Sequence, residues 1–400
     1  MNRVRLIHCG LAVALVSMSL SAAGADRPKA ALRTYQTRYY VIHTDLELDT
    51  VREAAARLTA MAEEYHRRTR GFAGVIRKRL GFYLFSNKAD YHAAGGPVGS
   101  AGVYTGKALM AMAPKKYGDN VWRIVQHEGF HQFAHTVISR RLPVWVDEGL
   151  AEYFGHGIWT GDGFVTGVIP PGRLKRVKTM ISSGQVMPFM DILMMKRKTW
   201  NSHLEMRNYD QAWSMVQFLV HAEEGKYRKA LGAFISDIAA HRPWKQAFVN
   251  RFGRNVTDFQ KRYSEWWLSL SKAPTADLYD KAVVQTLTSF LARAFARGRK
   301  FAAAEEFFRL AGEEKLKADS KQWLPPSLLV KALAQASRLK EWSIVSGEQP
   351  ALILTRADGV KFTGTFSLSS AGVGQIKVTV RRPGPATRPK KHPDKKPSGK

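Results

Sequence analysis

The chain has 400 residues and carries 62 Lys and Arg against 33 Asp and Glu, a formal net charge of +29. Its length allows two or three domains, and its hydrophobic fraction of 45% is ordinary for a globular core. The charge predicts attraction to anionic polymers or surfaces, but no helix-turn-helix, zinc-finger or RNA-recognition pattern accompanies it, so a specific nucleic-acid binder is not expected. The single cysteine, Cys9, excludes a disulfide framework.

The first 25 residues have the three parts of a secretory signal peptide. Arg3 and Arg5 form a basic start, residues 11–20 are apolar, and residues 23–25 are a small-residue cleavage site. We therefore expect a signal peptide at residues 1–25, a periplasmic or secreted protein, and no transmembrane span after cleavage. An uncleaved N-terminal anchor is the alternative.

Strands and one long helix are predicted before the centre of the chain. Residues 35–44 and 78–86 are rich in β-formers and predict strands. Residues 49–69 have apolar positions at helical spacing, with Asp49 as the expected N-cap. Residues 102–112 predict a strand pair or an edge strand.

Residues 127–131, His-Glu-Gly-Phe-His, form an HExxH motif. Residues four apart lie on one face of a helix, so His127 and His131 can direct two imidazoles at one metal ion. Glu128 is turned about 100° away from His127. It would lie beside the metal, where a general base takes a proton from water. The motif therefore predicts a catalytic zinc site with Glu128 as its base.

A catalytic zinc site usually has three protein ligands, and a second acidic segment offers the third. Residues 140–143 should end the first helix, and residues 144–154 should start a second helix that folds back on it. Glu148 would then face the histidine pair. Glu152, one turn later, would accept a hydrogen bond from the far nitrogen of a ligating histidine.

Other histidines and other interpretations stay open. His135 continues the i, i+4 series, but Ala134 and Val137 stand where the metzincin pattern has Gly and His, so we expect a polar neighbour of the site. His156 is an alternative ligand or a cleft-lining residue. The whole motif is alternatively a solvated helix, or a zinc-binding domain that has lost catalysis.

The segment HEGFH, followed by PVWVDEGLAEYF, resembles the gluzincins, the HExxH-plus-Glu metallopeptidases. It is most similar to the peptidase MA-like domains of bacterial secreted proteins, and the specific part of the likeness is residues 126–154. The resemblance implies Glu148 as the third zinc ligand. It also implies an α+β fold, in which a mostly helical zincin-like catalytic domain carries a small N-terminal mixed β-sheet.

The resemblance implies three further features. An edge strand at residues 108–113 would bind an extended substrate backbone. Tyr209 or His203 would donate a hydrogen bond to the oxyanion; the alternative for Tyr209 is a plain core or helix-start residue. Residues 110–113 lack the acidic residue with which the aminopeptidase branch anchors a free amino terminus, which favours an endopeptidase or an enzyme that acts on something other than peptides.

The rest of the chain is predicted to be mostly helical before a small β-module. Residues 381–400 contain 8 Lys or Arg and 1 Asp, a charge of +7, so we expect a disordered tail that tethers the protein to an anionic envelope polymer or only solubilises it. Helices are predicted at residues 189–195, 209–222, 227–239, 244–252, 256–271 and 279–310. The predicted domains are a metallopeptidase domain at residues 35–272, a helical segment at 276–340, a β-module at 341–382 and the tail at 383–400.

The sequence thus predicts a secreted or periplasmic zinc metallohydrolase, an endopeptidase that acts on a peptide or protein substrate with one zinc ion. His127, His131 and Glu148 would bind the metal, and Glu128 and Tyr209 would be the catalytic residues. The alternative is a catalytically inactive or structural zinc-binding module that associates with anionic cell-envelope polymers.

Overall fold

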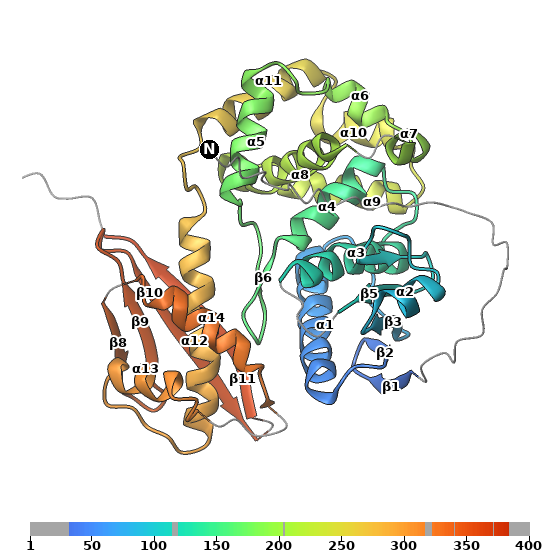
Figure 1. Ribbon diagram of the computed structural model, residues 1–400. Helices are drawn as coiled ribbons and strands as arrows, with labels where there is room; N and C mark the ends of the chain where they lie inside the picture. The colour runs from blue at the N-terminus through green and yellow to red at the C-terminus, as the bar shows by residue number, and fades with distance from the viewer. Residues whose placement is uncertain are drawn as a thin grey trace, which may run out of the picture. The chain divides into compact units, whose positions relative to one another are not determined.

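The computed structural model describes residues 32–113, 119–202, 205–316, 322–339, 341–370 and 372–383. The expected signal peptide, Cys9, His203 and residues 384–400 of the expected tail lie outside the described residues. The described residues form two compact units, one from residues 32–282 with 323–328 and one from residues 283–322 with 329–383 (Figure 1). Helices predominate and each unit has its own main sheet, so the predicted α+β class is confirmed.

The first unit begins with a five-stranded mixed sheet of order β1-β2-β3-β5-β4. The strand pairs β2–β3 and β3–β5 are parallel, and the two outer pairs are antiparallel. The small N-terminal mixed sheet expected from the sequence is therefore present. Its strands are β1 (Arg33–Gln36), β2 (Tyr40–Thr44), β3 (Leu80–Phe85), β4 (Gly102–Tyr104) and β5 (Leu109–Met112).

Three local predictions for this region were wrong. Residues 35–44 form a hairpin rather than one strand, because the Thr37 hydroxyl accepts a hydrogen bond from the Tyr40 backbone at 2.9 Å and turns the chain. The α1 helix (Leu48–Thr69) is preceded by Glu47, and Asp49 lies in its first turn rather than at the cap. The edge strand is β4 and not residues 108–113, because β5 pairs with β3 on its other side.

Helices make up the rest of the first unit. A Cβ atom on Gly149 would lie 2.5 Å from the Ala212 carbonyl oxygen, so only glycine allows α4 to approach α8 this closely. Figure 1 shows α4 lying between α3 and α8. The helices are α2 (Lys88–Ala93), α3 (Asp119–Val137), α4 (Val144–Gly155), α5 (Pro171–Ser182), α6 (Phe189–Met194), α7 (Arg197–Ser202), α8 (Met206–His221), α9 (Arg228–Ala239), α10 (Trp244–Phe252) and α11 (Val256–Ser269), with the turn η1 (Ala222–Gly225) after α8.

The second unit is an antiparallel sheet of order β11-β10-β9-β8 with helices beside it. Residues 283–296 of α12 pack on this sheet, where Val284 joins Leu354 and Phe362 in the core. Gly364 leaves room for the helix, because a Cβ there would collide with Thr288. The unit contains most of α12 (Ala276–Ala296) and α14 (Pro326–Ala336), together with α13 (Ala304–Gly312), β8 (Trp342–Val345), β9 (Ala351–Thr355), β10 (Lys361–Ser369) and β11 (Gly372–Arg381).

Within the described part of the chain, no helix combines the length and the apolar character that crossing a bilayer requires. The hairpin β6 (Ile158–Trp159) and β7 (Phe164–Val165) occupies the glycine-rich stretch that follows α4.

Candidate metal centre

The centre is built on α3 and α4, which pack against each other. Pro143 immediately precedes α4, where a residue without a free backbone N–H starts a new helix at no cost. Gln126 fixes the two helices together, because its side-chain amide donates to the backbone oxygens of Phe154 at 3.1 Å and Gly157 at 2.9 Å. The neighbouring His127 is thereby held facing α4.

Three side chains converge between these helices. The Nε2 atoms of His127 and His131 are 3.2 Å apart, and each lies 3.4 Å from Oε2 of Glu148. All three side chains are buried. Zinc–ligand bonds of about 2.0–2.1 Å in tetrahedral directions place neighbouring ligand atoms about 3.3 Å apart. His127, His131 and Glu148 therefore form a group whose spacing fits a bound metal ion.

The opposite nitrogen of each ring faces a carboxylate. His127 Nδ1 lies 3.1 Å from Glu152 Oε1, and His131 Nδ1 lies 2.9 Å from Asp147 Oδ1. An ionised carboxylate only accepts hydrogen bonds, so each neutral ring carries its proton on Nδ1 and keeps a lone pair on Nε2. Two nitrogen lone pairs and one carboxylate oxygen then point at the same space, an arrangement that can hold a cation.

The pKa shifts of these groups also favour a positive charge between them. Burial alone would lower the pKa of His127, but its hydrogen bonds to Glu148 and Glu152 outweigh burial and raise that pKa to about 9. The pKa of His131 is raised well above its usual value, because Asp147 and Glu148 likewise outweigh burial. Burial opposes the ionisation of the carboxyls, yet His131 and its neighbours hold the pKa of Glu148 below its usual range.

Two arginines hold the carboxylates in place. The guanidinium of Arg173, which is itself buried, contacts Glu152 and donates to the Tyr209 carbonyl oxygen at 3.1 Å. Arg197 contacts Glu148 and lies 2.5 Å from Asp147 Oδ2. Each histidine is thus backed by a carboxylate, and each of these carboxylates by an arginine.

Glu128 differs from the other acids of the centre. It is buried, and its Oε2 accepts a hydrogen bond of 2.8 Å from the Tyr104 backbone N–H on β4. Its Oε1 is buried without a hydrogen-bond partner in the described ranges. Burial raises the pKa of this carboxyl, although His127 and His131 oppose the shift. An unpaired carboxylate oxygen beside a cation-binding group is suited to accept a proton.

The remaining predicted residues have separate positions. Tyr209 lies beside the group, with its ring centroid 6.5 Å from that of His127 and 5.1 Å from that of Trp200. His156 is not part of the metal group, because its Nε2 lies 2.6 Å from Arg173 instead. Burial and Arg173 lower the pKa of His156 to about 3, which keeps it neutral. His203, the other candidate for the oxyanion, lies outside the described residues.

His135 is the polar neighbour that was expected. Its Nε2 lies 3.3 Å from Asp147 Oδ2, so His131, His135 and Asp147 form a second group of potential metal ligands. In this second group the two histidines form hydrogen bonds to different oxygens of Asp147, whereas the first group brings both histidine Nε2 atoms to one oxygen of Glu148. The first group is therefore the better candidate.

Sequence reasoning missed Asp147, Arg173 and Arg197. Asp147 precedes Glu148 and was visible as part of the acidic segment, but its partner depends on how α4 is rotated against α3. The arginines come from α5 and α7, which the sequence did not predict as helices. The only available signal was that three closely spaced carboxylates next to apolar residues need cationic partners.

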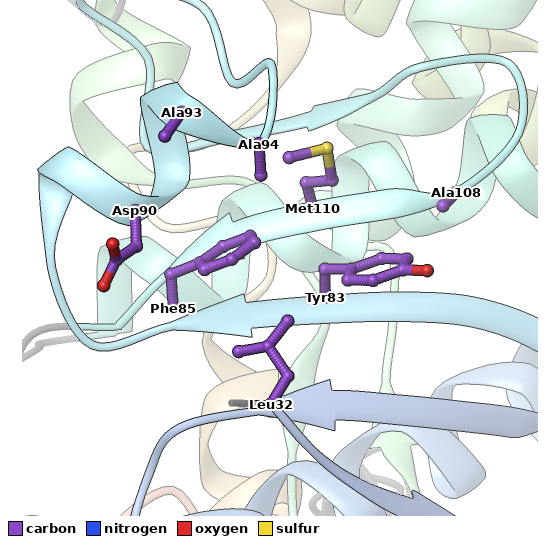
Figure 2. Close-up of a pocket in the computed structure, with 8 residues that line it drawn as sticks. All are labelled: Leu32, Tyr83, Phe85, Asp90, Ala93, Ala94, Ala108 and Met110. Atoms are coloured by element: carbon purple, nitrogen blue, oxygen red, sulfur yellow. The ribbon is translucent and has the colours of Figure 1, made fainter. Parts of the chain in front are cut away.

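A separate apolar pocket of about 510 Å³ lies on the sheet (Figure 2). It is lined by Tyr83, Phe85 and Met110, which alternate along their strands with Leu84 and Leu109. Residues that alternate along a strand face opposite sides of a sheet. A Cβ atom on Gly102 would contact both Ile124 of α3 and the side chain of Ala111. Ala111 and Leu109 therefore lie on the side of the sheet that faces α3. The pocket therefore opens on the side of the sheet away from the candidate metal centre.

Comparison with known proteins gives one match. The sequence pattern of a family described as a protein of unknown function (DUF1570) matches residues 122–245. No curated protein and no solved structure matches the chain. The matched segment contains all three side chains of the candidate metal group, together with Glu128, both supporting arginines and Tyr209.

Proposed function

We propose that this protein is a zinc-dependent hydrolase of the gluzincin type that cleaves peptide bonds as an endopeptidase. The observation that carries the proposal is the triangle formed by His127 Nε2, His131 Nε2 and Glu148 Oε2, with edges of 3.2, 3.4 and 3.4 Å. Its neighbour Glu128 provides a buried carboxylate oxygen that no other described group engages.

The donor set favours zinc over other metals. Two imidazole nitrogens and one carboxylate oxygen suit Zn²⁺, whereas Ca²⁺ and Mg²⁺ prefer oxygen ligands alone. Three protein ligands also leave one position for water, as in catalytic rather than structural zinc sites. When bound, zinc supplies a Lewis acid that polarises a carbonyl group and acidifies water.

The residues around the metal group would then each have a separate role in the reaction. Glu128 accepts the proton of the attacking water and passes it to the leaving amine, a role for which a carboxyl with a raised pKa is suited. Tyr209, beside His127, donates a hydrogen bond to the oxyanion. Glu152 and Asp147 hold the two rings in the tautomer that leaves Nε2 unprotonated.

The β4 strand is the part of the sheet that would bind substrate. It is an edge strand next to α3, and its Tyr104 N–H contacts Glu128. An extended peptide can add to such an edge through main-chain hydrogen bonds. Because this mode reads the backbone and the residues before α3 carry no acid for a free amino terminus, we propose cleavage within chains rather than at their ends.

Location and partners are also part of the proposal. The basic start, apolar stretch and small-residue site of residues 1–25 support export to the periplasm or the exterior. There, the charge of +7 in residues 381–400 would attract anionic envelope polymers.

The test uses the mature full chain and its Glu128→Gln variant. Metal analysis should give about one zinc per chain for both, and an unbiased peptide library should be cleaved internally by the wild type but not by Glu128→Gln. Glu63→Gln is the matched control, because Glu63 is an exposed acid of α1 paired with Arg38. Equal cleavage by wild type and Glu128→Gln would refute the mechanism. Zinc binding without any cleavage would favour the inactive or structural zinc module.

A further inference from the structure

Arg197 reaches the metal group from outside it. It begins α7, 49 positions after Glu148 in the chain, and its guanidinium contacts Glu148 through Nη1 and Asp147 through Nη2. The side chain of Arg197 is 38% exposed, whereas those of Glu148 and Asp147 are 3% and 1% exposed. One arginine thus covers two buried carboxylates from the solvent side.

The two oxygens of Glu148 have different partners. Oε2 lies 3.4 Å from both histidine Nε2 atoms, and Oε1 is engaged by Arg197. A charge-assisted bond from a guanidinium is among the stronger hydrogen bonds in proteins, and its planar fork fixes the orientation of the acceptor. The second branch of the fork, on Asp147 Oδ2 at 2.5 Å, prevents the guanidinium from following a rotation of Glu148.

We infer that Arg197 is a positioning residue that restricts Glu148 to one ligating oxygen. A carboxylate binds a metal ion through one oxygen or through both. Binding through both would turn Oε1 away from Arg197 and break their contact. Two imidazoles and a two-oxygen Glu148 would supply four protein atoms, so zinc would have to become five-coordinate to keep its water. Arg197 therefore keeps the site at three protein ligand atoms with one position for water.

This inference rests on the proposed function only in requiring a metal ion at His127, His131 and Glu148. The catalytic step is not part of it. Arg197 acts through Glu148 and does not contact the reacting atoms, so its effect should be visible in the coordination of the metal without any substrate.

The experiment is a comparison of zinc-loaded crystal structures of the full chain, wild type and Arg197→Met. In the wild type, one Glu148 oxygen should bind zinc while the other stays on Arg197. In Arg197→Met, both oxygens should move to bonding distance. Arg251→Met is the matched control: Arg251 is 36% exposed and pairs through two nitrogens with the buried Asp237, away from the metal group. It should leave Glu148 bound through one oxygen.

Cobalt substitution gives the same comparison in solution, because the visible spectrum of Co(II) depends on coordination. Arg197→Met should shift this spectrum, Arg197→Lys should shift it less, and Arg251→Met should not. Two-oxygen binding in the wild type, or one-oxygen binding in Arg197→Met, overturns the role of Arg197 while leaving the metal site intact. Failure of the folded wild type to bind metal at this group overturns both the role of Arg197 and the proposed function.

Discussion

Nε2 of His127 faces Nε2 of His131 at 3.2 Å, while Nδ1 of each ring is turned to a carboxylate. If both histidines were neutral, the lone pairs on their Nε2 atoms would repel each other at this distance. A proton or a metal ion relieves the repulsion, and Glu148 adds a third electron pair to the same space.

Metal binding should release protons at neutral pH. The pKa of His127 is raised to about 9 and that of His131 is raised well above its usual value, so at pH 7 we expect the metal-free pair to hold at least one extra proton. A metal ion must displace it, so zinc addition at pH 7 should release one or two protons. Calorimetric titration in two buffers of different ionisation enthalpy measures the number. Absence of any release at pH 7 would contradict the assignment of His127 and His131.

Glu152→Gln should weaken metal binding without removing a ligand. The substitution keeps the shape of the side chain but removes the charge that faces His127 Nδ1 at 3.1 Å. Changes of this kind cost roughly 10- to 100-fold in metal affinity. Competition with a chelator of known affinity measures the loss, and Glu63→Gln should bind as tightly as wild type. Unchanged affinity in a folded Glu152→Gln variant would mean that Glu152 serves packing alone.

Gly149→Ala should separate α4 from α8. The new Cβ would lie 2.5 Å from the Ala212 carbonyl oxygen, which belongs to backbone and cannot rotate away. Overpacking of this kind costs about 1–3 kcal/mol in the free energy of unfolding, and it should also lower zinc affinity because Glu148 precedes Gly149. Urea unfolding measures the first effect. Gly172→Ala in α5, where a Cβ meets no atom within 4 Å, is the control; equal stability of the two variants would refute the argument.

Tyr209→Phe should lower kcat and leave the metal content unchanged. Removing one hydrogen-bond donor from an oxyanion costs roughly 100- to 1,000-fold in kcat. The ring packing against His127 and Trp200 is kept by phenylalanine. Steady-state kinetics on a peptide identified from the library gives the result. If kcat is retained, Tyr209 is a packing residue, and the oxyanion donor lies elsewhere.

Local periodicity explains which parts of the site were predictable. Helical spacing placed His127 and His131 on one face, and the proline break before α4 indicated the return of Glu148. Glu152 followed from its position one turn after Glu148. These residues depend on two helices and one turn, which short-range rules describe well.

The parts that were missed depend on long-range packing. Arg173 and Arg197 reach the centre from α5 and α7, and no pattern near residues 173 or 197 indicates a buried partner. The prediction of the edge strand was wrong for the same reason. The hairpin of β4 and β5 is visible locally, but which strand lies outside is decided by the parallel pairing of β5 with β3, which is distant in the chain.

The hydrogen bond between Tyr104 N–H and Glu128 would limit how far a bound peptide can pair with β4. A backbone amide that is already engaged is not available to a newly added strand. If a peptide adds to β4 as proposed, its pairing would therefore end at Tyr104, next to the Glu128 carboxylate. The extent of the pairing with β4, rather than the side chains of the bound peptide, would then decide which peptide bond lies next to Glu128.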